Sequence, residues 1–270
     1  MKTRIISGAV LAVILVVVLL SGGPLLAAAL LFCSVIGMYE MMKALGVITE
    51  EKRFSPVAIT AFAGAVVYYA VLLFTGASFF GETAAVVVIA VMASYVAVFP
   101  SYRCDQAIAA AFSFLYVGFM LSFIYLIRAD EHGAFLVWLV FGSSWAADTA
   151  AYFTGVLLGR HKMTPVLSPK KTWEGAIGGV LGAGLIAALL SLIVDHQRNP
   201  MFFFIICAVG AVISIFGDLA ASAIKREKGI KDYGTLIPGH GGIMDRFDSV
   251  IFTAPCVYLL TQIFLHAGLF

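Results

Sequence analysis

The stretch KREKGIKDYGTLIPGHGGIMDRFDS, Lys225–Ser249, is rich in charged residues and glycine, and it continues directly into VIFTAPCVYLLTQIFLHAGLF, Val250–Phe270, which contains no Asp, Glu, Lys or Arg. An apolar run of about 20 residues is long enough to cross the hydrocarbon core of a bilayer as a helix. Runs of this kind recur along nearly the whole chain. The sequence therefore predicts a helical membrane protein that carries a highly charged loop.

The composition supports this prediction. Of the 270 residues, 62% are hydrophobic and only 12% are charged, and the mean hydropathy is +1.03. A water-soluble globule of this size needs more polar surface, and the alternating pattern of a membrane β-barrel is absent. We expect an all-α polytopic integral membrane protein, with one transmembrane domain over residues 1–270. Residues 1–130 are the expected scaffold, and residues 131–270 the catalytic half.

Apolar runs bounded by glycine, proline and charge predict about nine spans. They cover residues 5–21, 24–44, 55–76, 80–99, 106–127, 134–158, 172–194, 200–224 and 246–267. The first run also resembles a signal peptide, but another apolar run follows at once, so we expect a retained helix. The cysteines have no paired spacing, and we expect neither a disulfide nor a zinc site from them.

The distribution of Lys and Arg predicts the orientation, because cytoplasmic loops collect these residues. If the spans alternate, fifteen of the seventeen basic residues fall on the face that carries the N-terminus. They are Lys2, Arg4, Lys43, Lys52, Arg53, Arg103, Arg160, Lys162, Lys170, Lys171, Lys225, Arg226, Lys228, Lys231 and Arg246. Arg128 and Arg198 fall on the other face. We therefore expect a cytosolic N-terminus, with the polar site at the cytosolic ends of helices 6 to 9.

Acidic residues inside a bilayer are costly and usually face a cavity, a partner or an ion. Four aspartates are of this kind, namely Asp148, Asp218, Asp245 and Asp248. The last two are three residues apart, so their carboxylates share one side of a helix and could bind a hard divalent cation. The alternatives are ordinary first-turn acids for this pair, an ion pair with a nearby Lys or Arg for Asp218, and a buried hydrogen bond for Asp148.

The segment VLSPKKTWEG, Val166–Gly175, contains a candidate helix start. Ser168 is a suitable N-cap and Pro169 a suitable first residue, which places Lys170 and Lys171 in the first turn. Cations there oppose the helix dipole unless a phosphate occupies the terminus. We therefore expect a phosphate site at this position. The alternative is that the lysines only anchor the cytosolic end of the helix.

The charged loop contains PGHGG, Pro238–Gly242, after several basic residues. Its glycines allow the backbone to approach a ligand closely, and His240 could donate to a phosphate or simply be solvated. Basic residues, glycines and metal-binding acids together supply what a nucleoside triphosphate with Mg²⁺ requires. The loop is therefore a candidate nucleotide site.

Two segments resemble those of a known family. SAIKREKGIKDYGTLIPGHGGIMDRFD, Ser222–Asp248, resembles the signature of the phosphatidate cytidylyltransferases, also called CDP-diacylglycerol synthases. DTAAYFTGVLLGRHK, Asp148–Lys162, with SPKKTWEG, Ser168–Gly175, is similar to an upstream block of the same family. The resemblance implies a reaction of CTP with phosphatidate that gives CDP-diacylglycerol and pyrophosphate. This is an Mg²⁺-dependent step of phospholipid synthesis at the cytosolic face of the inner membrane.

The resemblance also implies roles for individual residues. The expected catalytic residues are Asp218, Asp245, Asp248, Lys225 and Arg226, and the three aspartates are the expected metal ligands. The expected substrate-binding residues are Asp148, Ser168, Lys170, Lys171, Ser222, Lys231, Asp232, His240, Gly241, Gly242 and Arg246. The expected partners are phosphatidate, CTP and the bilayer, without nucleic acid. One or two Mg²⁺ ions, a second monovalent or divalent cation, and a homodimer are compatible with the sequence.

Two other functions are considered. In an ion-coupled transporter, Asp148 and Asp218 would be proton or cation sites, but the basic glycine loop would have no role and polar residues should reach both faces. The second alternative is another CTP-using lipid transferase, a CDP-alcohol phosphotransferase or a lipid kinase. Such an enzyme would use the same metal and phosphate chemistry on different substrates. The chain contains neither a D-G-x-x-A-R start nor a Walker P-loop.

Overall fold

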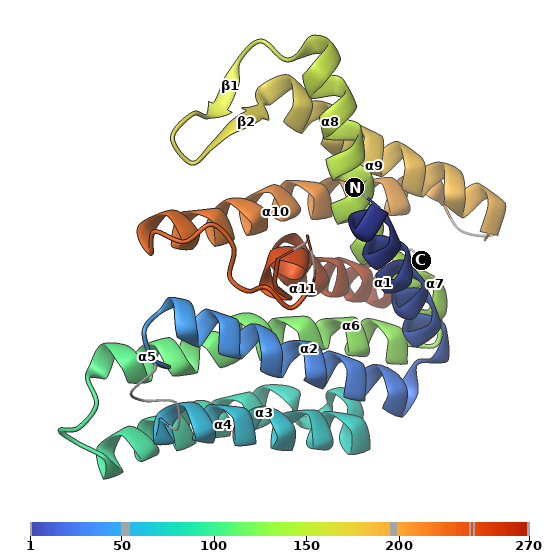
Figure 1. Ribbon diagram of the computed structural model, residues 1–270. Helices are drawn as coiled ribbons and strands as arrows, with labels where there is room; N and C mark the ends of the chain where they lie inside the picture. Colours follow the sequence, from blue (N-terminus) through green and yellow to red (C-terminus); the bar gives the residue numbers. More distant parts are fainter. Residues whose placement is uncertain (1, 50–54, 195–198, 238, 240, 269–270) are drawn as a thin grey trace. The chain divides into compact units, whose positions relative to one another are not determined.

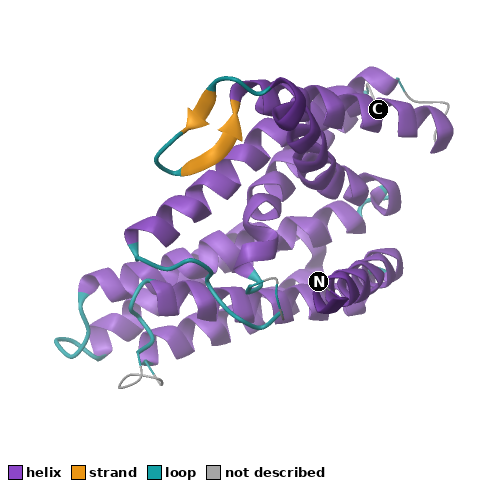
Figure 2. Cartoon of the chain, turned by 45° about the horizontal axis from the view of Figure 1, so that its top comes forward, coloured by secondary structure: helices purple, strands orange, loops and turns teal. Residues whose placement is uncertain are grey.

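The computed structural model describes residues 2–49, 55–194, 199–237, 239 and 241–268. Helices make up most of this part of the chain, as predicted, and one short two-stranded hairpin is the exception (Figure 2). The elements in chain order are α1 (Lys2–Ser21), α2 (Gly23–Ala44), α3 (Pro56–Thr75), η1 (Gly76–Phe79), α4 (Phe80–Ala97), α5 (Cys104–Ser113), η2 (Phe114–Phe119), α6 (Met120–Ala129), α7 (Gly133–Phe141), η3 (Gly142–Ala146), α8 (Ala147–Leu158), β1 (Lys162–Thr164), β2 (Ser168–Thr172), α9 (Trp173–Val194), α10 (Pro200–Glu227) and α11 (Met244–His266).

Many of these helices are suited to a bilayer. Seven helical stretches of the described chain are long and apolar enough to cross one, namely Gly23–Ala44, Pro56–Ala97, Cys104–Ala129, Gly133–Leu158, Trp173–Val194, Pro200–Glu227 and Met244–His266. α1 adds a shorter apolar stretch, Gly8–Ser21. The chain is therefore a polytopic membrane protein.

The predicted ranges agree with the helices to within a few residues at each end. Pro56–Ala97 contains two of these ranges, because the chain turns at Gly76, where φ is +61°. Val87 of α4 then packs against Gly64 of α3, so α3 and α4 form a helical hairpin. The ranges 106–127 and 134–158 each correspond to two α-helices joined by a π-helical turn, η2 or η3.

The described chain divides into two compact units. The first comprises Met1–Ala129 and Glu227–Phe247, and α2 to α6 lie side by side within it (Figure 1). Its core contains Tyr68 and Tyr69, whose hydroxyls form hydrogen bonds with Ser122 at 2.8 Å and Ser34 at 2.9 Å. Arg128 donates to the carbonyl of Leu19 at 2.8 Å. These bonds satisfy polar groups that would be costly to bury alone.

The second unit comprises Asp130–Arg226 and Asp248–Phe270. Within it, α8 and α9 pack with their backbones in close approach. A Cβ at Gly175 would lie 2.9 Å from the Ala151 carbonyl oxygen, and a Cβ at Gly179 would lie 2.8 Å from that of Ala147. The small residues at these positions allow this close helix packing.

Candidate active site

A β-hairpin stands at the start of α9. β1 and β2 pair antiparallel, with Lys162 opposite Thr172. The base of the hairpin is closed by Glu174, whose carboxylate accepts the backbone N–H groups of Arg160 and His161 at 3.1 and 3.2 Å. The Glu174 carboxylate also lies 2.6 Å from His161 Nδ1. The hairpin is thus tied to the first turn of α9.

The prediction that Ser168 caps this helix is wrong. Ser168, Lys170 and Lys171 lie in β2, and α9 begins at Trp173. Thr172 serves as the cap instead, because its hydroxyl accepts the Gly175 N–H at 3.1 Å. The two lysines therefore do not lie in a helical first turn, and the expected phosphate site at that helix N-terminus is withdrawn.

Three of the predicted residues nevertheless gather in the second unit. Lys171 Nζ forms an ion pair with Asp218 Oδ2 at 2.5 Å. Asp148, in the first turn of α8, lies close enough to both for electrostatic interaction. The alternative considered for Asp218, an ion pair with a nearby base, is thus what the structure shows. The cluster thus brings together one residue each from α8, β2 and α10.

A pocket of about 410 Å³ opens between α8, α9 and the hairpin. Its polar lining includes Asp148, Lys162, Lys170, Lys171 and Thr172. This volume is in the range of ligand sites. Lys171 is paired with Asp218, and the remaining Lys162 and Lys170 against Asp148 leave a net positive charge, which suits an anion such as a phosphate.

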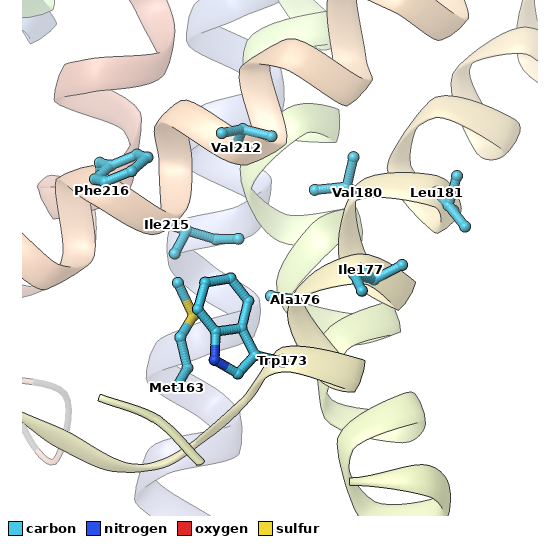
Figure 3. Close-up of a pocket in the computed structure, with 9 residues that line it drawn as sticks. All are labelled: Met163, Trp173, Ala176, Ile177, Val180, Leu181, Val212, Ile215 and Phe216. Carbon is cyan, nitrogen blue, oxygen red and sulfur yellow. The ribbon is translucent and has the colours of Figure 1, made fainter. Parts of the chain in front are cut away.

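An apolar groove of about 380 Å³ lies beside this pocket, between α9 and α10 (Figure 3). The residues that line it are Met163, Trp173, Ala176, Ile177, Val180, Leu181, Val212, Ile215 and Phe216. Met163, Ala176 and Ile215 also line the basic pocket, so the two cavities adjoin. Figure 3 shows the side chains of Met163, Trp173 and Ile215 close together at one end of the groove.

α10 and α11 are in close contact where they carry aspartates. A Cβ at Gly217 would lie 2.8 Å from the carbonyl oxygen of Asp248. Asp218 follows Gly217 directly, so Asp218 and Asp248 belong to two helices whose backbones touch at this level. Asp245 lies three residues before Asp248 on α11, as the sequence pattern predicts.

In the first unit, Asp245 organises the charged loop. Its Oδ2 accepts the N–H of Tyr233 at 2.8 Å and that of Gly242 at 3.0 Å, and the residue is 8% exposed. Gly241 has φ +82° and lies against the Asp245 carboxylate. A residue with a side chain would be strained at this φ. The glycine-rich turn is thus folded onto the first turn of α11.

The other predicted residues lie along the same loop and its flanking helix ends. Ser222 and Lys225 are half-buried in α10, and Arg226, Lys231, Asp232 and Arg246 are exposed. His240 and Pro238 lie outside the described residues. The exposed bases are accessible to a soluble anion.

The comparison with protein families identifies the chain. Residues 2–264 match the model of the cytidylyltransferase family. The chain belongs to this family. The match includes both segments on which the resemblance was noted, the loop before α11 and the residues from α8 to the start of α9.

Several curated relatives resemble this cytidylyltransferase-family chain, and they are named phosphatidate cytidylyltransferase. The one from Bacillus subtilis is 28% identical over 272 aligned positions, which cover 98% of each chain. The one from Thermotoga maritima is 39% identical over 169 residues, 61% of this chain and 62% of the relative. The one from Staphylococcus epidermidis is 38% identical over 152 residues, 56% of this chain and 58% of the relative. For the last two, the match thus spans less than two thirds of the relative's length.

The donor chemistry of Asp218, Asp245 and Asp248 fits a hard divalent cation, because Mg²⁺ prefers carboxylate oxygens. Among the residues that the structure describes, however, no group of three or more His, Cys, Asp or Glu side chains is placed to hold a metal ion. Asp218 is paired with Lys171, and Asp245 accepts two backbone N–H groups. The three aspartates therefore have donor chemistry that suits a metal ion.

A buried acid that contacts the charged loop was not predicted from the sequence. Glu40, on α2, is 4% exposed, and its carboxylate accepts the N–H groups of Ile243 and Met244. Its partners lie more than 200 residues later in this cytidylyltransferase-family chain. The available signal was an acid within an otherwise apolar run, which is the feature that drew attention to the four aspartates.

Proposed function

We propose that the chain is a phosphatidate cytidylyltransferase, which joins the cytidylyl group of CTP to phosphatidate and releases pyrophosphate. The observation that carries the proposal is the basic pocket adjoining the apolar groove. A phosphate head group and its hydrocarbon chain require this combination of surfaces. The family membership and the names of the relatives support the same assignment.

The lipid is proposed to bind with its phosphate near Lys170 and Lys171 and with one acyl chain in the groove. Trp173, Ile177 and Phe216 of the groove are each more than half exposed, so a chain can reach them from the bilayer. Phosphatidate then enters sideways from the inner leaflet. CTP approaches from the cytosol, where the exposed bases of the charged loop are accessible.

The reaction is an in-line displacement at phosphorus. An oxygen of the phosphatidate phosphate forms a bond to the α-phosphorus of CTP. The bond from that phosphorus to the β-phosphate oxygen breaks, and pyrophosphate leaves with the electron pair. A phosphate monoester is already nucleophilic at neutral pH, so the chain needs no strong general base. Its main tasks are orientation and charge neutralisation, because both reactants are polyanions.

The basic residues are proposed to perform that neutralisation. Lys170 and Lys171 act on the lipid phosphate, and Lys225, Arg226, Lys231 and Arg246 act on the phosphates of CTP. The further proposed substrate contacts are Asp148, Ser168, Ser222, Asp232, His240, Gly241 and Gly242. Mg²⁺, as one or two ions, would be held by Asp218, Asp245 and Asp248, where it supplies positive charge to the phosphate oxygens.

The proposed topology has nine spans, a cytosolic N-terminus and a site that faces the cytosol of a bacterial inner membrane. Its support is the bias of Lys and Arg toward one set of loops. The same bias argues against an ion-coupled transporter, whose pathway should present polar groups on both faces.

Filling the groove should weaken lipid binding selectively. Val180 lines the groove but not the basic pocket, so the indole of Val180→Trp should displace the acyl chain and leave the phosphate site unchanged. We expect the KM for long-chain phosphatidate to rise about tenfold, equivalent to about 1.4 kcal/mol, with little change for dioctanoyl phosphatidate or for CTP. The control is Leu185→Trp, on the same helix and 55% exposed but outside the groove. An equal rise in KM for both chain lengths would contradict this assignment of the groove.

The proposal is tested by incubating the purified protein with CTP, phosphatidate and Mg²⁺ in detergent and identifying lipids by mass spectrometry. We expect CDP-diacylglycerol, and we expect EDTA to prevent its formation. A CTP-independent ion flux in proteoliposomes, with no CDP-lipid, would favour the transporter instead.

A further inference from the structure

Glu40 is a buried acid near the end of a membrane helix. It lies on α2 and is 4% exposed. Its Oε1 accepts the N–H of Ile243 at 3.1 Å, and its Oε2 accepts the N–H of Met244 at 2.8 Å. Both carboxylate oxygens are therefore used at the point where α11 begins.

The start of α11 needs such an acceptor. The first N–H groups of a helix have no partner within it, and a preceding Ser, Thr, Asp or Asn usually supplies one. Here the residues just before α11 are Gly241, Gly242 and Ile243, whose side chains contain no acceptor. Glu40 provides it from 203 residues earlier in the chain. Its negative charge also favours the positive end of the helix dipole.

Two glycines of the charged loop make room for this carboxylate. A Cβ at Gly234 or Gly242 would overlap the Glu40 carboxylate. Gly234 does not have a positive φ, so its backbone conformation does not require glycine. A glycine is required there because a side chain would overlap Glu40. The loop thus closes around Glu40 from two sides.

Asp245 fixes the loop at the same place. Its carboxylate accepts the N–H of Gly242, which is the residue next to the Glu40 contact. Asp245 therefore binds the N–H of Gly242, and Glu40 binds the N–H groups of the next two residues, Ile243 and Met244. A shift of the Glu40 contact would move Asp245 with it.

We infer that Glu40 is a positioning residue for the reaction, which sets where Asp245 and the glycine-rich loop stand for phosphate transfer. The inference rests on the proposed function. It gives a role to the N-terminal helices, to which the sequence assigned only a scaffold. The part of the charged loop over Glu227–Phe247 belongs to the same compact unit as these helices.

The test is Glu40→Gln, with Glu82→Gln as the control, because Glu82 is an exposed acid of the same unit. A glutamine keeps the size of the side chain but replaces one acceptor by a donor, which repels one of the two N–H groups. We expect faster hydrogen exchange of the Ile243 and Met244 amides and a 10- to 100-fold lower kcat, the usual effect of losing a supporting hydrogen bond at a site. The KM for phosphatidate should stay unchanged.

A second variant keeps the inference testable if Glu40→Gln does not fold. Gly234→Ala removes no polar group and presses a methyl group against the Glu40 carboxylate, so it should lower kcat in the same way. If kcat per folded molecule stays within about twofold of wild type in the folded variant, Glu40 is only structural and the inference is wrong. If wild type forms no CDP-lipid, the proposed function fails, while amide exchange still decides whether Glu40 holds the start of α11.

Discussion

Asp245→Asn is expected to lower the rate of CDP-diacylglycerol formation by roughly a thousandfold, equivalent to about 4 kcal/mol of transition-state stabilisation. The asparagine amide oxygen can still accept the N–H groups of Tyr233 and Gly242, which Asp245 accepts at 2.8 and 3.0 Å. The loop should therefore stay folded while the negative charge is lost. The measurement is the initial rate at saturating CTP and phosphatidate, together with the thermal unfolding of the detergent-solubilised protein.

The matched control for this variant is Asp105→Asn. Asp105 is an exposed acid at the start of α5, paired with Arg103 at 3.1 Å. An exposed ion pair of this kind contributes little, so its loss should leave the rate unchanged. If Asp245→Asn keeps more than half of the wild-type rate, a metal or phosphate-transfer role for Asp245 is excluded.

Lys171→Ala is expected to lower kcat/KM for phosphatidate by roughly a hundredfold, about 2.7 kcal/mol. Lys171 faces both the basic pocket and Asp218, 2.5 Å away. Its removal takes a cation from the lipid phosphate and leaves Asp218 without this partner. In an Asp218→Asn background the same change should cost less, because the two residues act as a pair.

Lys43→Ala serves as the control for the loss of a cation, since Lys43 is an exposed base at the end of α2. Its kinetics should match wild type. If Lys171→Ala lowers kcat/KM for phosphatidate by the same factor in the wild-type and Asp218→Asn backgrounds, the ion pair has no part in the reaction.

The spans were predictable because their cause is local. Twenty apolar residues bounded by glycine, proline or charge form a membrane helix whatever surrounds them. The turn between α3 and α4 was also predictable, since Gly76 interrupts two such runs.

The hairpin before α9 was not predictable in the same way. Both Ser168 and Thr172 are suitable caps, and local rules preferred Ser168 because Pro169 follows it. Glu174 decides between them, because it ties the start of α9 to the backbone of Arg160 and His161. That contact joins residues thirteen and fourteen positions apart across the hairpin, beyond the reach of a capping rule.

The contact of Glu40 is a second one that local sequence patterns do not predict, because its partners are far apart in the sequence. The sequence indicates that an acid in an apolar helix has a partner. It does not indicate that this partner is the backbone of Ile243 and Met244. The four aspartates drew attention as acids in apolar runs, and Glu40 shares that feature, but its contact joins residues 203 and 204 positions apart.

The most direct test of cytidylyl transfer uses CTP labelled at a single phosphate. Purified protein is incubated with phosphatidate, Mg²⁺ and CTP that carries ³²P at either the α- or the γ-position. The α-label should appear in the lipid product and the γ-label in pyrophosphate. A γ-label in the lipid would reveal a kinase. If neither the α-labelled nor the γ-labelled CTP transfers its label to lipid, the chain is not a cytidylyltransferase.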